Sequence, residues 1–112
     1  MKIRAKRSSL TFEELSAANL ARQELYFHPL NAWNYTDWAC AAAGELGEAC
    51  NLIKKWRRGE DVSIDEIAKE IADTVIYLDL LSQRLGIDLG EAVREKFNRV
   101  SDRVGAPIKF TK

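Results

Sequence analysis

The sequence predicts an all-α fold, a four-helix antiparallel bundle assembled as a homo-oligomer. Apolar residues recur at spacings of three and four in four stretches, capping signals precede three of these stretches, and glycines follow three of them. We find no convincing strand pattern. The chain has 112 residues, the size of one domain, so we expect a single domain over residues 1–112.

The first helix is expected over residues 12–27. Thr11 followed by Glu14 has the spacing of a capping box, in which each side chain accepts a hydrogen bond from the other residue's backbone. Pro29 ends the helix because proline disfavours the α conformation of the residue before it. The loop that follows, residues 30–35, is rich in aromatic and amide side chains and is therefore more than a plain connection.

The second helix is expected over residues 36–58 and should end at Gly59. At 3.6 residues per turn, Trp38 and Trp56 both lie about 20° around the axis from Glu45. Two indole side chains therefore bracket an acidic residue along one stripe of this helix.

The third helix is expected over residues 64–85, capped by Ser63 and Glu66 and ended by Gly86. Its predicted core stripe consists of Ile67, Ile71, Thr74, Leu78, Leu81 and Leu85. The helix also carries apolar residues on several other sides, more than a small monomer could cover, so we predict a homodimer or a dimer of dimers.

The fourth helix is expected over residues 89–104, capped by Asp88 and Glu91 and closed by Gly105. A basic stripe runs directly beside its apolar stripe, at helical spacing, and could reach toward a neighbouring helix. This basic stripe consists of Lys96, Arg99 and Arg103.

Two pairs of acidic residues stand at helical spacing on the second and third helices. Glu45 and Glu48 are separated by 21 residues from Glu70 and Asp73. Taken singly, such pairs are most often solvated surface charges. Together, however, they lie on helices that a short connection makes antiparallel neighbours, so we expect the four carboxylates to face each other. An all-oxygen site suits Mg²⁺, with Mn²⁺ as an alternative, and it does not suit a di-iron centre, which requires histidines.

Cations and aromatic residues near these acids suggest a phosphorylated, base-bearing ligand. Lys55 on the second helix and the basic stripe of the fourth could neutralise phosphate oxygens, while Trp38 and Trp56 could stack on a base. Core packing is the alternative explanation for each tryptophan, and a solvated helix face is the alternative for the basic stripe.

Composition and charge exclude several other classes of protein. Seventeen basic and seventeen acidic residues cancel, which gives no reason to expect nucleic acid or an anionic membrane as a partner. Residues 2–7 are basic without an apolar run, so we expect no signal peptide or membrane span and a cytoplasmic location. A zinc site is not expected, since His28 is the single histidine and the thiols of Cys40 and Cys50, ten residues apart, are expected to be reduced and buried.

The chain resembles the MazG-like all-α nucleoside triphosphate pyrophosphohydrolases over residues 12–108. The segments that carry the resemblance are Gly44-Glu45-Leu46-Gly47-Glu48, Glu70-Ile71-Ala72-Asp73-Thr74-Val75-Ile76-Tyr77-Leu78 and Ala92-Val93-Arg94-Glu95-Lys96-Phe97-Asn98. The family pattern is two acids three residues apart, a spacer of a dozen to nearly thirty residues, then a second such pair.

The resemblance implies Mg²⁺-dependent cleavage of a nucleoside triphosphate between the α and β phosphates, giving a nucleoside monophosphate and pyrophosphate. Glu45, Glu48, Glu70 and Asp73 match the metal ligands, with Glu45 or Glu48 also a candidate general base. Lys96 matches a basic residue near the phosphates, and Tyr77 a residue that lines the nucleotide pocket in some relatives. Some relatives place a histidine and a tryptophan closer to the first acidic pair than His28 and Trp33 lie here.

Two alternatives remain open at this stage. A phosphoribosyl-ATP pyrophosphohydrolase-like enzyme would keep the fold and the metal and change the substrate. A non-catalytic helical interaction module would bind no Mg²⁺ and turn over no nucleotide. Deoxynucleotide housekeeping is the commonest role in the family, so we favour deoxynucleoside triphosphates as substrates.

Overall fold

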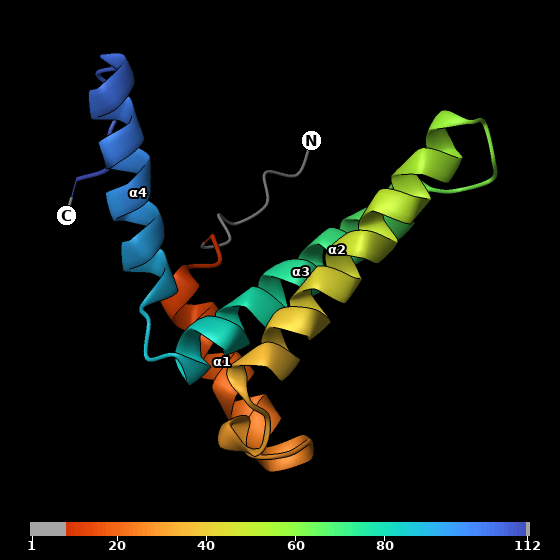
Figure 1. Ribbon diagram of the computed structural model, residues 1–112, viewed down its shortest axis with the longest axis horizontal. Helices are drawn as coiled ribbons and strands as arrows, with labels where there is room; N and C mark the ends of the chain where they lie inside the picture. The colour runs from red at the N-terminus through yellow and green to blue at the C-terminus, as the bar shows by residue number, and fades with distance from the viewer. Residues whose placement is uncertain (1–8, 112) are drawn as a thin grey trace, which may run out of the picture.

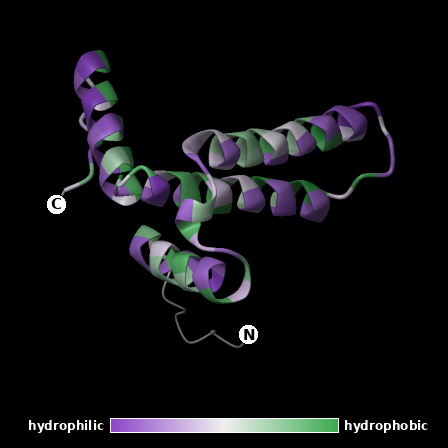
Figure 2. Ribbon diagram, turned by 60° about the horizontal axis from the view of Figure 1, so that its bottom comes forward, coloured by the Kyte–Doolittle hydropathy of each residue, from purple (hydrophilic) through white to green (hydrophobic). Residues whose placement is uncertain are grey.

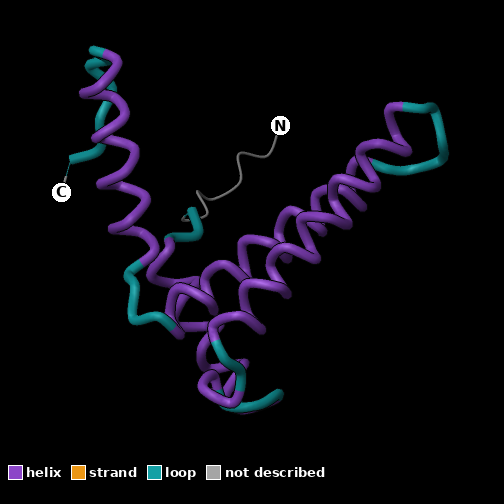
Figure 3. The backbone as a smooth tube through the Cα atoms, in the orientation of Figure 1, coloured by secondary structure: helices purple, strands orange, loops and turns teal. Residues whose placement is uncertain are grey.

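The computed structural model describes residues 9–111, which form four α-helices and one short 3-10 helix (Figures 1 and 3). Across this described range there is no strand, so the all-α prediction is confirmed, and every predicted helix end lies within one residue of the observed one. The basic residues 2–7 lie outside the described range. The elements are α1 (Phe12–Tyr26), η1 (Leu30–Ala32), α2 (Tyr35–Arg57), α3 (Ile64–Arg84) and α4 (Leu89–Val104).

Local hydrogen bonds explain why the helices begin where they do. Thr11, Ser63 and Asp88 are N-caps as predicted, and each side chain accepts a hydrogen bond from the backbone N–H three residues later. The start of α2 uses a capping box that was not predicted, between Asn34 and Asp37. Because Asn34 caps this helix, it begins at Tyr35.

An antiparallel pair formed by α2 and α3 is the main packing unit of the chain (Figure 1). The two helices lie side by side, joined by the turn around Gly59, whose backbone φ of +85° suits a residue without a side chain. The apolar core is small, because only five apolar residues are buried among the described residues. They are Trp38, Ala42, Ala49, Ile67 and Leu80.

A buried carboxylate fastens α1 across the end of this pair. Asp79 of α3 is completely buried and accepts hydrogen bonds from the Ser16 hydroxyl, from Asn19 Nδ2 at 3.0 Å and from Gln83 Nε2 at 2.8 Å. Gln83 Nε2 also donates to the Ser16 carbonyl at 3.0 Å. Since a buried charge is tolerated only when its oxygens are satisfied, this network fixes α1 relative to α3.

The fourth helix points away from the α2–α3 pair (Figures 1 and 3). Over the described spans of the two helices, no Cα atom of α4 lies within 8 Å of one in α2. The Cα radius of gyration is 17.1 Å, whereas a compact chain of this size has about 13 Å. The four helices therefore do not close a bundle within one chain.

Large apolar side chains are exposed on all four α-helices. Figure 2 colours the hydrophobic residues of these helices green. Ile67 and Thr74 of the predicted α3 core stripe are buried, but Ile71, Leu78 and Leu85 are about half exposed, so their expected burial is wrong within one chain. Cys40 and Cys50 are free, as expected, but exposed rather than buried. The exposed stripes are Leu46 and Ile53 on α2, Ile71, Val75 and Leu78 on α3, and Val93, Phe97 and Val104 on α4. Of the helices described, none combines the length and the apolar character needed to cross a membrane.

Asp79→Asn is expected to destabilise the fold by about 2 kcal/mol, because a neutral amide accepts the hydrogen bonds of Asn19 and Gln83 more weakly than a carboxylate and has only one acceptor oxygen. Urea unfolding at fixed protein concentration measures the change. Asp61→Asn, in the exposed turn between α2 and α3, is the matched control and should change stability by less than about 0.5 kcal/mol. Equal effects of the two substitutions would contradict the role given to Asp79.

Candidate functional site

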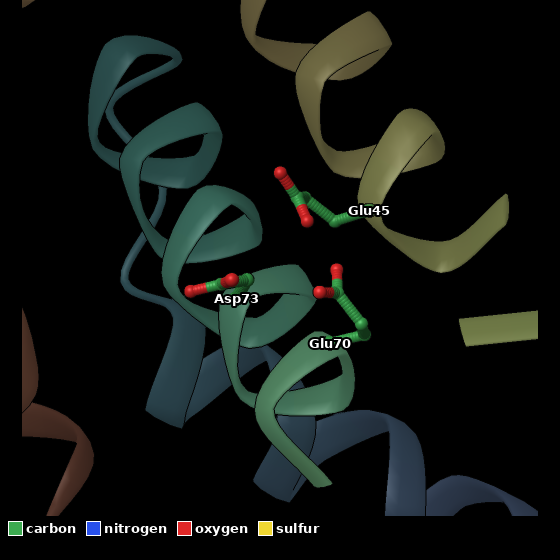
Figure 4. Close-up of side chains that lie close together, drawn as sticks. All are labelled: Glu45, Glu70 and Asp73. Carbon is green, nitrogen blue, oxygen red and sulfur yellow. The ribbon is translucent and has the colours of Figure 1, made fainter. Parts of the chain in front are cut away.

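Three of the four predicted metal ligands come together across the α2–α3 interface (Figure 4). One carboxylate oxygen from each of Glu45, Glu70 and Asp73 lies within 4.8 Å of the others. Glu45 extends from α2 toward Glu70, which stands one turn before Asp73 on α3. Glu48 is outside this group of three, although Glu70 influences the pKa of its carboxyl. The antiparallel pairing predicted from the short turn therefore sets the two acidic pairs opposite each other.

The cluster has an excess of negative charge. Glu70 raises the pKa of Glu48 above its usual value, first through a hydrogen bond between the carboxyls and then through charge repulsion. The pKa of Glu70 is raised likewise, chiefly by a hydrogen bond with Glu45. In addition, Glu70 Oε2 is buried without a hydrogen-bond partner among the described residues. A buried acceptor without a donor is unfavourable, so the cluster is suited to a cation.

The donor set fits Mg²⁺. All the candidate ligands are carboxylate oxygens, which are hard donors, and the described chain places no histidine or thiol in the group. Oxygen ligands around Mg²⁺ at about 2.1 Å lie at most about 4.2 Å apart, so only small side-chain movements would complete the coordination. Glu45, Glu70 and Asp73 would hold the ion, with Glu48 beside them.

An aromatic pocket of about 320 Å³ adjoins the acidic cluster and shares Asp73 with it. The rings of Trp33 and Trp38 are 4.5 Å apart between centroids, and His28 lies 4.8 Å from Trp33. Tyr77 lies 6.2 Å from Trp38. A flat ligand bound among these rings would therefore have a carboxylate at the edge of its site. Besides Asp73, the lining residues are Asn19, Arg22, Gln23, Phe27, His28, Trp33, Trp38, Ile76, Tyr77 and Leu80.

The connecting segment, residues 27–34 between α1 and α2, is held in place by hydrogen bonds from both helices. Trp38 Nε1 donates to the Leu30 carbonyl at 3.1 Å, and Gln23 Nε2 donates to the His28 carbonyl at 2.9 Å. The Leu30 N–H in turn donates to the Glu24 carboxylate at 2.6 Å. The segment that the sequence marked as unusually aromatic is thus a fixed wall of the pocket.

The two tryptophans on the predicted α2 stripe have different surroundings. Trp38 lies in the pocket wall and is only 1% exposed, so it is both a core and a pocket residue. Trp56 is 50% exposed and lies outside this pocket, 18 residues further along α2 and so about 27 Å away. Lys55 lies seven residues beyond Glu48, about 10 Å along the helix. Tyr77 lines the pocket, and its contact with a nucleotide stays a prediction.

The basic stripe of α4 does not approach α2 within one chain, because no Cα atom of α4 lies within 8 Å of one in α2. Its three cations make no ion pair with any residue described in the structure. Lys96, Arg99 and Arg103 are therefore available to a group outside the single chain.

Six polar and aromatic residues of the pocket were absent from the predicted site: Asn19, Arg22 and Gln23 on α1, and Phe27, His28 and Trp33 between α1 and α2. The aromatic character of residues 30–35 was a usable signal for Trp33. No sequence signal marks the three α1 residues, because their place depends on how α1 crosses α3.

A larger cavity of about 860 Å³ lies away from the acidic cluster, between the start of α1, the α3–α4 turn and the start of α4. Phe12, Ile87, Val93 and Phe110 form much of its wall, and none of the four candidate metal ligands lines it. The smaller aromatic pocket is the better candidate site because it adjoins the carboxylates.

In comparisons with known proteins, no family model, no curated protein and no solved structure matched the chain significantly.

Mg²⁺ is expected to raise the melting temperature of the protein, and Glu70→Gln should remove most of that increase. Without Mg²⁺ the variant should be at least as stable as the parent protein, because one repelling charge and one orphaned acceptor are lost. Thermal unfolding with and without millimolar Mg²⁺ measures both effects. Glu95→Gln, at an exposed position on α4, is the control and should keep the full response to Mg²⁺. A Glu70→Gln variant that responds as the parent does would rule out Glu70 as a ligand.

Proposed function

We propose that the protein is a Mg²⁺-dependent nucleoside triphosphate pyrophosphohydrolase, cleaving deoxynucleoside triphosphates between the α and β phosphates. The observation that carries the proposal is the sharing of Asp73 between the acidic cluster and the aromatic pocket. A base in the pocket would extend its phosphates toward the carboxylates. The resemblance to the MazG-like family favours the same activity, and nucleotide-pool housekeeping is the corresponding role.

In the proposed mechanism the chain's residues position the substrate and move one proton. Trp33, Trp38 and Tyr77 hold the base, and Glu45 or Glu48 accepts the proton of the attacking water. The water oxygen forms a bond to the α-phosphorus, and the bond from that phosphorus to the bridging oxygen breaks, so that pyrophosphate leaves with the bonding electrons. Mg²⁺, when bound by the acidic cluster, supplies positive charge against the phosphate oxygens.

The departing pyrophosphate requires cations that one chain does not place near the acids. Lys55 is the nearest basic candidate on α2, and we propose that Lys96, Arg99 and Arg103 act from the α4 of another copy. A homodimer or a dimer of dimers would also cover the exposed apolar stripes of α2, α3 and α4. The proposed assembly would therefore bury the exposed apolar stripes and also bring positive charge to the acidic cluster.

Glu48→Gln and Asp73→Asn are each expected to reduce Mg²⁺-dependent pyrophosphate release by at least about a hundredfold, because a proton acceptor or a metal ligand is lost. The assay uses a panel of common and damaged deoxynucleoside triphosphates, with circular dichroism to verify the helical fold. Asp61→Asn is the matched control and should retain the parent rate. Full activity in both site variants would refute the mechanism. Absence of both turnover and Mg²⁺ binding in the parent protein would favour a non-catalytic helical module.

Sedimentation at micromolar concentration is expected to give the mass of a dimer or a tetramer. Ile71→Lys should shift the protein toward smaller species, since it places a charge in the exposed apolar stripe of α3. Lys69→Glu, at an exposed α3 position outside that stripe, should leave the mass unchanged. A monomeric parent protein would contradict the proposed assembly.

A further inference from the structure

Asn19 presents a hydrogen-bond acceptor to the aromatic pocket. Its side chain is 4% exposed, and both hydrogens of Nδ2 are used, toward the Ile76 carbonyl at 2.9 Å and Asp79 Oδ2 at 3.0 Å. Because both partners can only accept, the orientation of the amide is determined chemically. Its remaining polar atom, Oδ1, accepts no hydrogen bond from the residues described, and Asn19 lines the pocket.

Gln23, one turn further along α1, repeats this arrangement. Its side chain is 7% exposed, and Nε2 donates to the His28 carbonyl at 2.9 Å. Within the described chain nothing donates to Gln23 Oε1. One hydrogen of Nε2 also remains, but the two amide oxygens of Asn19 and Gln23 stand a single helical turn apart on the same wall.

Two nitrogen atoms of the neighbouring rings are directed at the backbone. His28 Nδ1 lies 3.0 Å from the Pro29 carbonyl. Trp38 Nε1 is already occupied by the Leu30 carbonyl. Arg22 is exposed, and Arg22, Trp33 Nε1 and the Tyr77 hydroxyl are the other donors that the lining offers. The amide oxygens of Asn19 and Gln23 are thus the free acceptors on the α1 wall of the pocket.

From this arrangement we propose that the pocket selects bases with an exocyclic amino group in the position of cytosine N4 or adenine N6, over uracil and thymine. This specificity rests on the proposed function, in which the pocket holds the base. An amino group donates two hydrogens and can satisfy the amide oxygens of Asn19 and Gln23. Uracil and thymine present a carbonyl oxygen at the same position, which leaves those two acceptors without a donor and facing another acceptor.

The decisive comparison uses two nearly isosteric probes, the α,β-imido analogues of dCTP and dUTP, which resist cleavage at the proposed bond. Calorimetry with Mg²⁺ should show the cytosine analogue binding at least about tenfold more tightly. A third probe, the pyrimidin-2-one analogue with no group at C4, should fall between them, because it lacks the donor and also lacks the opposing oxygen. Equal affinity, tighter binding of the uracil analogue, or no binding of any probe would overturn the inference.

Two substitutions at one position separate the acceptor from simple packing. Gln23→Met keeps the length of the side chain but removes the oxygen, and should reduce the preference for cytosine to within about threefold. Gln23→Glu and Gln23→Met both lose the hydrogen bond from Nε2 to the His28 carbonyl, but Gln23→Glu keeps an acceptor and should therefore retain the preference. Asn51→Met, an exposed amide position on α2, is the matched control for Gln23→Met and should leave the ratio unchanged. Loss of the preference in Gln23→Glu, or its persistence in Gln23→Met, would contradict the assignment.

Turnover of ordinary dCTP and dUTP distinguishes failure of this inference from failure of the proposed function. Pyrophosphate release from both at similar rates, with equal affinity for the two analogues, would overturn the amino-group preference and leave the hydrolase proposal intact. A clear binding preference without pyrophosphate release would support the preference and refute the hydrolase.

Discussion

The burial of Asp79 is the constraint on which the rest of the site depends. A carboxylate without access to water must receive hydrogen bonds, and here Ser16 and Asn19 of α1 and Gln83 of α3 supply them. This requirement holds α1 across the end of the α2–α3 pair and so creates the wall of the aromatic pocket. It also orients the Asn19 amide, whose oxygen is left for a ligand. One structural network thus determines both the shape of the pocket and part of its polarity.

The acidic cluster carries the opposite kind of constraint. Asp79 has all the donors it requires, whereas Glu70 retains a buried oxygen without a partner in the described chain, and carboxyl neighbours raise the pKa of both Glu48 and Glu70. Packing like charges into a helix interface opposes folding, whereas apolar side chains at the same positions would not repel each other. A local conflict of this kind, in a helix pair that is otherwise regular, is typical of a functional site rather than of a packing surface.

Local sequence patterns predicted the helices well, but they predicted less well which side of each helix packs against the rest of the chain. Capping side chains and glycines act within a few residues, so the helix ends could be derived from the chain alone, although Asn34 and Asp37 were missed. The helical wheel placed Trp38 and Trp56 alike, yet only Trp38 meets the connecting segment, where its indole donates to Leu30. The pocket residues of α1 could not be predicted, because their position follows from a contact between residues about 60 apart in sequence. Such contacts leave no periodic signal in the chain.

The open shape of the single chain links stability to function. Among the described residues five apolar residues are buried and twenty large ones are exposed. This core is small compared with the conformational entropy that ordering the chain costs. Covering the stripes on α2 and α3 would exclude water beside the acidic cluster, which strengthens the attraction between a bound cation and its ligands. A covering copy would also bring cations of its own α4 stripe, which find no partner within the described chain. In the proposed assembly, the contact that stabilises the fold is therefore the same contact that completes the charge balance of the site.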